Sequence, residues 1–139
     1  MKKLCGVNPP VITVFDGNGR IDLEACRRHA DFLIEKGVDG LAYLGTSGEF
    51  SILTMDEKKS LIGEMIRYVD HRVNAIVGVG DTCLKHTMEL LDFTEGAGAD
   101  GALPVNPYIA FKDLMAITGL PSTTLTTRIR ALKKEGRIS

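Results

Sequence analysis

The sequence has 139 residues, enough for one domain with a hydrophobic core, alone or with a small appendage. Its 17 basic and 18 acidic residues give a formal net charge of -1, so no global field favours nucleic acid, a membrane or a highly charged substrate. Dispersed cysteines and histidines argue against a disulfide framework and a metal site, and no apolar run approaches the roughly 18 residues of a membrane span, which predicts a soluble, cytoplasmic protein without a membrane partner.

Four short apolar runs are predicted to be β-strands because they combine β-branched residues with glycine or proline borders. They cover residues 9–15, 40–44, 74–80 and 101–105. Nearly continuous apolar runs of this kind are typical of parallel strands that are buried on both faces. The first run is entered through two prolines, which suits a strand whose leading residue needs no ladder donor.

Amphipathic helices are predicted between these strands. The first covers residues 23–36, with Asp22 as its N-cap. The second begins at a capping box that opens with Thr54, and the third follows a cap at Asp81 or Thr82. This alternation predicts a parallel sheet with right-handed crossovers, either closed as a barrel or open and doubly wound. The dinucleotide fingerprint G-x-G-x-x-G is absent after the first run, which disfavours a nucleotide-binding domain.

The stretch of residues 43–50 lies at the carboxyl end of the second predicted strand. Gly45 and Gly48 let the backbone approach a ligand closely, and Thr46 and Ser47 offer hydroxyls and backbone N–H groups. These are the donors that a small carboxylate needs, so the stretch is interpreted as an anion-binding loop. An ordinary strand-to-helix turn would use the same residues for geometry and local capping, and on the residues alone this alternative stays open.

Several motifs follow one another along residues 6–108. They include Asn8-Pro9-Pro10-Val11 with Thr13, Asp16-Gly17-Asn18-Gly19, Gly37-Val38-Asp39-Gly40, Gly45-Thr46-Ser47-Gly48-Glu49, Gly98-Ala99-Asp100-Gly101 and Asn106-Pro107-Tyr108. Together they resemble the dihydrodipicolinate synthase and N-acetylneuraminate lyase family, and within it the aldolases of 2-keto-3-deoxy sugar acids. The resemblance implies a (β/α)8 barrel that condenses or cleaves pyruvate-type 2-keto acids through a Schiff base on a lysine. No cofactor and no metal are expected.

The resemblance also assigns roles to individual residues. Thr46 and Ser47 match the hydroxyl pair that holds the pyruvate carboxylate, and Gly48 and Glu49 match the rest of that loop. Pyruvate or another small 2-keto acid is therefore the expected ligand. Tyr108 matches the first tyrosine of the family's Pro-Tyr-Tyr segment and is a remnant of its catalytic machinery. The second tyrosine, which in many members reaches the neighbouring subunit's active site, is replaced by Ile109.

The resemblance stops at Tyr108, before the family's fifth strand with its proton-relaying tyrosine and its sixth strand with the Schiff-base lysine. A complete barrel needs on the order of 250 residues. We therefore expect an α/β fold that is half of a (β/α)8 TIM barrel, with four parallel strands and three helices, and that is catalytically incompetent alone. Lys36, Lys58 and Lys85 are expected on polar helix faces, where none replaces the missing nucleophile. Tyr43 is expected to pack in the core.

Residues 111–139 follow a different pattern of helix, glycine turn and longer helix, which predicts a C-terminal helical hairpin. Residues 111–138 resemble the helix-turn-helix of winged-helix transcription regulators. That resemblance would turn the following residues toward DNA: Ser122, Thr123, Thr124, Thr127, Arg128 and Arg130. A hairpin that covers the open face of the half sheet explains the apolar stripe without any ligand, so nucleic-acid binding is not expected.

The sequence therefore divides into an aldolase-family half barrel at residues 1–110 and a helix-turn-helix-like tail at residues 111–139. Three functions remain open: a truncated or chimeric member of the pyruvate-dependent lyase family that lacks chemistry, a DNA-binding module on this scaffold, and a lyase whose remaining strands come from another chain. The abrupt change of pattern without a linker favours the first. The incompletely covered sheet further predicts a homo-oligomer.

Overall fold

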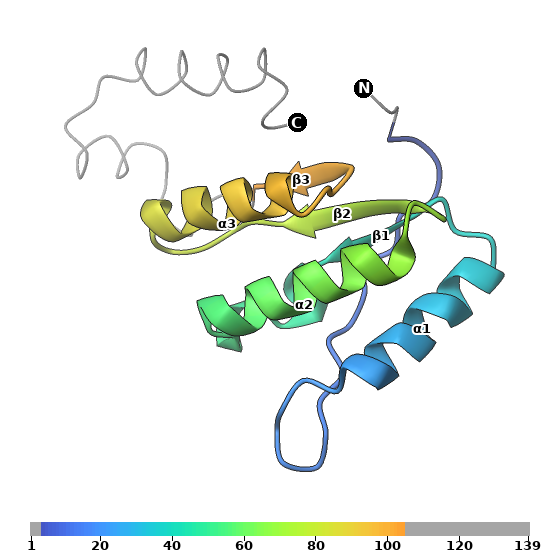
Figure 1. Ribbon diagram of the computed structural model, residues 1–139, viewed down its shortest axis with the longest axis horizontal. Coiled ribbons are helices and arrows are strands. Elements are labelled where there is room, and N and C mark those ends of the chain that lie inside the picture. Colours follow the sequence, from blue (N-terminus) through green and yellow to red (C-terminus); the bar gives the residue numbers. More distant parts are fainter. Residues whose placement is uncertain (1–3, 105–139) are drawn as a thin grey trace.

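Strands and helices alternate along the chain in the computed structural model, which describes residues 4–104 (Figure 1). In chain order the elements are α1 (Leu23–Glu35), β1 (Gly40–Tyr43), the 3-10 helices η1 (Thr46–Gly48) and η2 (Phe50–Ile52), α2 (Met55–Val69), β2 (Asn74–Gly78), α3 (Leu84–Gly96) and β3 (Gly101–Leu103). The predicted α/β class and parallel sheet are confirmed for this part of the chain.

The sheet has the strand order β1-β2-β3, and both pairs are parallel. Gly40 is in register with Asn74, and Ile76 is in register with Gly101. β2 therefore lies between the other two strands, and all five of its residues are buried. Consecutive strands lie side by side with a helix between them, which is the arrangement of repeated βαβ units.

The first predicted strand is present only as extended chain beside β1. Pro10 forms an isolated parallel bridge with Ala42, the Val11 N–H donates to the Ala42 carbonyl at 2.9 Å, and the Ala42 N–H donates to the Pro9 carbonyl at 3.0 Å. The prediction of four strands is therefore wrong for residues 4–104, which contain three strands, while the first predicted strand pairs with β1 only through this bridge. Two successive prolines have no N–H groups, so the ladder does not extend through them.

The ends of the strands and the start of α3 also differ from the predicted ones. The strands end earlier than their apolar runs do, and Val105, the predicted end of the last strand, lies outside the described residues. The N-cap of α3 is Cys83, not Asp81 or Thr82. The Asp81 carboxylate nevertheless serves the same turn, because its Oδ1 accepts a hydrogen bond from the Cys83 N–H at 3.0 Å. The two predicted caps therefore lie two residues and one residue too early, and Asp81 instead accepts a hydrogen bond from the N-cap residue itself.

The hydrophobic core lies between one face of the sheet and the three helices. Alternate strand residues share this core with the buried faces of the helices: Leu41, Tyr43, Ala75, Val77, Cys26, Ala30, Leu61, Ile62, Met65, Val69, Leu90 and Leu91. α2 contacts both α1 and α3 and lies between them over the sheet (Figure 1). On the opposite face, Ile12 and Leu103 remain 49% and 48% exposed. The described helices thus cover only one side of the sheet.

Segment 11–15 is held against α1 by a thiol. The Val14 N–H donates to Cys26 Sγ at 3.4 Å, and Cys26 is only 2% exposed. Asp22 caps α1 as predicted, since its Oδ1 accepts from the Ala25 N–H at 2.9 Å. The connection between the first extended segment and α1 is therefore ordered at both of its ends.

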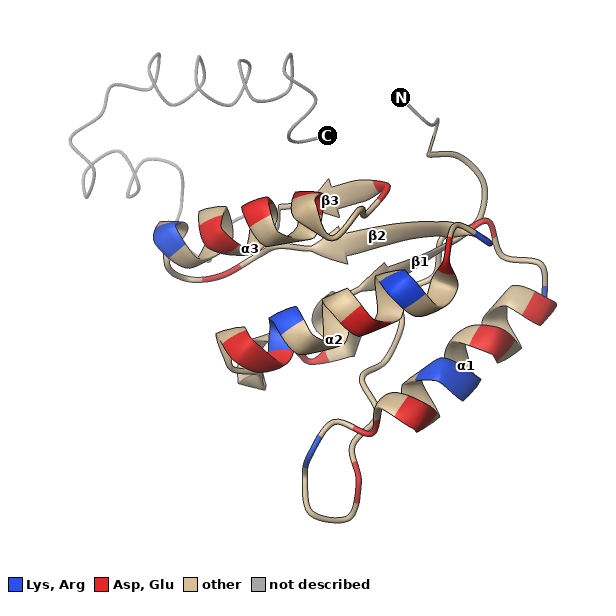
Figure 2. Ribbon diagram, in the orientation of Figure 1, with Lys and Arg blue, Asp and Glu red and all other residues tan. Residues whose placement is uncertain are grey.

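α1 and α2 carry charged residues of both signs, whereas α3 carries one lysine in its first turn and then only acidic residues (Figure 2). Asp31 on α1 accepts from the Tyr68 hydroxyl at 2.5 Å and pairs with Arg72 at 2.9 Å, and these two contacts lower the pKa of its carboxyl. Lys59 on α2 pairs with Glu89 on α3 at 2.6 Å. Within residues 4–104, no helix combines the length and the apolar character needed to cross a membrane.

The first prediction concerns the capping box of α2. The Thr54 N–H donates to Glu57 Oε2 at 2.8 Å, and the Glu57 N–H donates to Thr54 Oγ1 at 3.3 Å. In Thr54→Ala the Glu57 N–H loses its acceptor, and the Glu57 carboxylate loses the hydroxyl that helps to orient it toward the N–H of residue 54. This variant should therefore lose about 1 kcal/mol of unfolding free energy in urea denaturation. Ser60→Ala, at an exposed position inside the same helix, is the control and should change stability little. Equal midpoints for the two variants would contradict the assigned cap.

Candidate carboxylate-binding loop

The predicted binding loop follows β1 directly and is built from two 3-10 turns. Leu44, two residues before η1, and Glu49, directly after it, have positive φ angles of 53° and 55°. Non-glycine residues rarely adopt this conformation, and such strain is concentrated at functional sites. The loop therefore departs from a relaxed turn at both ends, although neither residue is a glycine.

Contacts with the extended segment 11–13 and with β2 hold this strained backbone in place. The Thr13 hydroxyl donates to the Gly48 carbonyl at 2.7 Å. A Cβ at Gly48 would lie 3.1 Å from the Val11 carbonyl oxygen, and a side chain at Gly78 would collide with the Leu44 carbonyl. Close backbone approach thus requires glycine at position 78 and leaves little room for a side chain at position 48. Thr13 was part of the recognised motifs, but its sequence position alone assigned it no role.

The two candidate hydroxyls lie on the exposed side of this loop. Thr46 and Ser47 are exposed, whereas Gly48 is buried. The Gly48 N–H donates to the Gly45 carbonyl at 3.0 Å, and the Glu49 N–H donates to the Thr46 carbonyl at 3.1 Å. Within residues 4–104, neither hydroxyl has a hydrogen-bond partner. The loop backbone is therefore fixed by its own hydrogen bonds while both hydroxyls remain available to a ligand.

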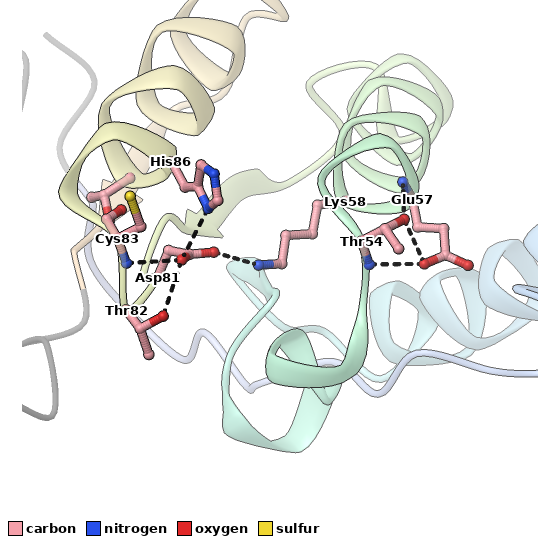
Figure 3. Close-up of polar contacts among 8 residues, drawn as sticks. Thr54, Glu57, Lys58, Asp81, Thr82, Cys83 and His86 are labelled. Carbon is pink, nitrogen blue, oxygen red and sulfur yellow. Dashed lines mark hydrogen bonds and ion pairs between the residues drawn. The ribbon is translucent and has the colours of Figure 1, made fainter.

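A buried ion pair lies beside the loop, which corrects the expectation that Lys58 is on a polar helix face. Lys58 is 4% exposed, and its Nζ lies 3.0 Å from Asp81 Oδ2 (Figure 3). Lys36 and Lys85 are exposed, as expected. The residue pattern of α2 did not predict the burial of Lys58. Its long aliphatic chain is buried, while its ammonium group reaches a carboxylate that is distant in sequence.

Asp81 joins several groups at the carboxyl end of β2. Its Oδ1 accepts from the Cys83 N–H at 3.0 Å and lies 3.3 Å from His86 Nδ1 (Figure 3). Burial opposes ionisation of this carboxyl, but the Cys83 N–H and the Lys58 ammonium outweigh it and lower the pKa of Asp81. The Lys58 ammonium also lies 5.8 Å from the centre of the Phe50 ring in η2. The ion pair therefore touches the segment that continues the binding loop.

Tyr43 packs in the core, as expected. It is 3% exposed, its hydroxyl has no partner within residues 4–104, and burial raises the pKa of the phenol well above its usual range. It lies on the helix side of the sheet, within the hydrophobic core. Tyr108 lies outside the described residues, as do the candidate DNA-binding residues of the tail: Ser122, Thr123, Thr124, Thr127, Arg128 and Arg130.

Two family profiles match the chain. The dihydrodipicolinate synthetase family matches residues 3–116, and a winged helix-turn-helix DNA-binding family matches residues 102–139. The first profile covers the whole described structure and the binding loop. The second confirms the resemblance of the tail and overlaps the end of the first match.

Curated relatives support the first match. A probable 2-dehydro-3-deoxy-D-pentonate aldolase of Escherichia coli is 44% identical over 108 residues, which are 78% of this chain and 36% of that protein. A 4-hydroxy-tetrahydrodipicolinate synthase of Methanocaldococcus jannaschii is 39% identical over 103 residues, or 74% of this chain and 35% of that protein. The chain therefore spans about a third of the length of the curated relatives it matches.

A solved structure gives the same result in three dimensions. A prophage protein of E. coli K12 from the dihydrodipicolinic acid synthase family, in complex with pyruvate, matches with a TM-score of 0.74 and 42% identity. The match covers 76% of this chain and 35% of that protein. The three parallel strands and three helices thus correspond to part of that family's barrel. The chain belongs to the dihydrodipicolinate synthetase family.

Proposed function

We propose that residues 4–104 form the first part of a pyruvate-aldolase barrel, and that the loop after β1 binds the carboxylate of pyruvate or a similar small 2-keto acid. The observation that carries the proposal is the pair of hydroxyls of Thr46 and Ser47, which have no hydrogen-bond partner among residues 4–104. They lie on a loop with a strained backbone that the Thr13 hydroxyl holds at Gly48. The similar E. coli prophage protein, solved in complex with pyruvate, supports the choice of ligand.

Binding at this loop needs few other parts of a barrel. The contacts that hold the loop come from the Thr13 hydroxyl in segment 11–13 and from the close approach of Gly78 in β2, both within the described residues. Hydroxyl donors to a carboxylate form charge-assisted hydrogen bonds, which are stronger than neutral ones. An exposed loop shares these bonds with water, so the affinity for a small anion should be low, on the order of millimolar.

We further propose that the polypeptide of 139 residues forms no Schiff base by itself. Schiff-base catalysis needs an uncharged lysine amine beside the bound ketone, in a site that water does not fill. Among residues 4–104, Lys58 is the buried lysine, and its ammonium is paired with Asp81. The family's lysine segment has no counterpart in the sequence. Schiff-base chemistry is therefore proposed for complete members of the family, whereas this polypeptide by itself is proposed only to bind the 2-keto acid.

The second prediction tests both parts of this proposal. Pyruvate added to the labelled chain should shift the NMR signals of Thr46 and Ser47, and Ser47→Ala should weaken binding roughly tenfold because a hydrogen bond to a charged group is lost. Ser51→Ala, an exposed serine in the adjacent turn, is the matched control and should bind as the wild type does. Intact mass after incubation with pyruvate and borohydride should show no adduct. An adduct on one lysine, abolished by Ser47→Ala, would show that a Schiff-base site exists.

A second candidate function rests on the winged helix-turn-helix match to residues 102–139. The charge of the described residues gives this function little support, because α1 and α2 carry both signs and α3 is mainly acidic (Figure 2). Recognition would depend on the tail, with Arg128 and Arg130 contacting phosphates or base edges.

The third prediction is that the chain has no specific affinity for duplex DNA. Fluorescence anisotropy with duplexes of different sequence should give only weak binding near physiological salt. Sequence-dependent binding that falls steeply with salt, and that is weakened in the double variant Arg128→Ala/Arg130→Ala, would instead establish the DNA-binding function.

The fourth prediction concerns association. Ile12 and Leu103 share the sheet face that the described helices leave uncovered, and both are about half exposed. We expect a homo-oligomer that buries this face, measured by light scattering at micromolar concentration. A stable monomer of 15.1 kDa would contradict this, and Ile12→Lys should shift an oligomer toward monomer whereas Phe32→Lys, at an exposed position on α1, should not.

A further inference from the structure

Lys58 is a buried cation that the proposed binding chemistry does not use. Its side chain is 5% exposed, and that of its partner Asp81 is 14% exposed. Removing two charges from water costs free energy that their mutual attraction only partly returns, so such a pair is a poor device for stability alone. Lys59, the next residue, shows the ordinary alternative, because it pairs with Glu89 near the surface between two helices.

The contacts of Lys58 join three separate parts of the fold. The residue lies in the first turns of α2, its Nζ is 3.0 Å from Asp81 in the loop after β2, and it is 5.8 Å from the Phe50 ring in the loop after β1. Asp81 is fixed in turn by the Cys83 N–H and His86 (Figure 3). The Lys58 ammonium thus lies between the loop that follows β1 and the loop that follows β2.

The loop after β1 needs such external support. Phe50 is 6% exposed and directly follows Glu49, which has a left-handed backbone. The strain at Glu49 is local, so the loop would relax unless its flanking residue were anchored. On the other side the loop is anchored by the Thr13 hydroxyl at Gly48. Lys58 supplies the corresponding anchor downstream through the face of the Phe50 ring.

We propose that Lys58 is a positioning residue: paired with Asp81 and seated on Phe50, it holds the loop of Thr46 and Ser47 in the conformation that receives a carboxylate. The consequence for ligand binding rests on the proposed function, whereas the consequence for loop conformation does not. A loop held in advance loses less conformational freedom when the ligand arrives, and this raises affinity without a new contact.

The test compares Lys58→Met with Lys59→Met, because both lysines make one ion pair and one ring contact, but Lys59 contacts α3 and not the loop. The first readout is hydrogen exchange, without ligand, at the Gly48 and Glu49 amides, which are hydrogen-bonded within the loop. We expect exchange at these amides to rise about tenfold or more in Lys58→Met relative to amides of α1, and not in Lys59→Met. Lys58→Arg, which keeps the charge, should restore most of the protection.

The second readout is the dissociation constant for pyruvate, which should rise in parallel with loop exchange in Lys58→Met and stay near the wild-type value in Lys59→Met. Equal loop protection in both variants, or protection lost evenly over the whole chain, would overturn the proposal. If the wild type binds no pyruvate, the proposed function fails, and loop exchange still decides the role of Lys58. If Lys58→Met does not fold, Asp81→Asn and Phe50→Leu must each raise exchange at Gly48 and Glu49, or the proposal is wrong.

Discussion

The described fold depends on β2, which is flanked by β1 and β3 and is buried along its whole length. Its backbone hydrogen bonds are satisfied on both sides, and its alternate side chains enter the core under the three helices. The close approach of Leu44 to Gly78 fixes where the loop after β1 begins, and Asp81 follows from the end of the same strand. One central strand therefore locates both the strained loop and the carboxylate beside it.

Local patterns predicted the helices well because their signals lie close together in sequence. The capping box at Thr54 and the N-cap at Asp22 are both present, and α1 ends one residue before the predicted limit. The first strand was predicted from its apolar character, but ladder formation also needs N–H donors, and Pro9 and Pro10 have none. The third helix begins after Cys83 because Asp81 is engaged with the N–H of that residue.

The candidate site was only partly visible in the sequence. Its loop could be found because glycines and hydroxyls after a strand are a local signal, and the family resemblance gave Thr46 and Ser47 a role. Thr13 contacts Gly48, 35 positions away, and Lys58 contacts Asp81, 23 positions away. The periodicity of a single helix or strand carries no information about such long-range contacts. Lys58 was assigned to a polar face because a charged residue on an amphipathic helix normally lies there. Only the fold reveals its acidic partner.

The sulfur contact beneath the first extended segment has a consequence for chemical labelling. Cys5 and Cys83 are at the surface, whereas Cys26 is buried beneath Val14, and burial raises the pKa of the Cys26 thiol. A thiol reagent therefore meets two accessible cysteines in the folded chain and reaches the third when the packing around Cys26, which includes segment 11–15, opens. The rate at which Cys26 is alkylated thus reports how often this packing opens. Because segment 11–15 carries Thr13, a single natural thiol monitors the surroundings of the upstream anchor of the binding loop.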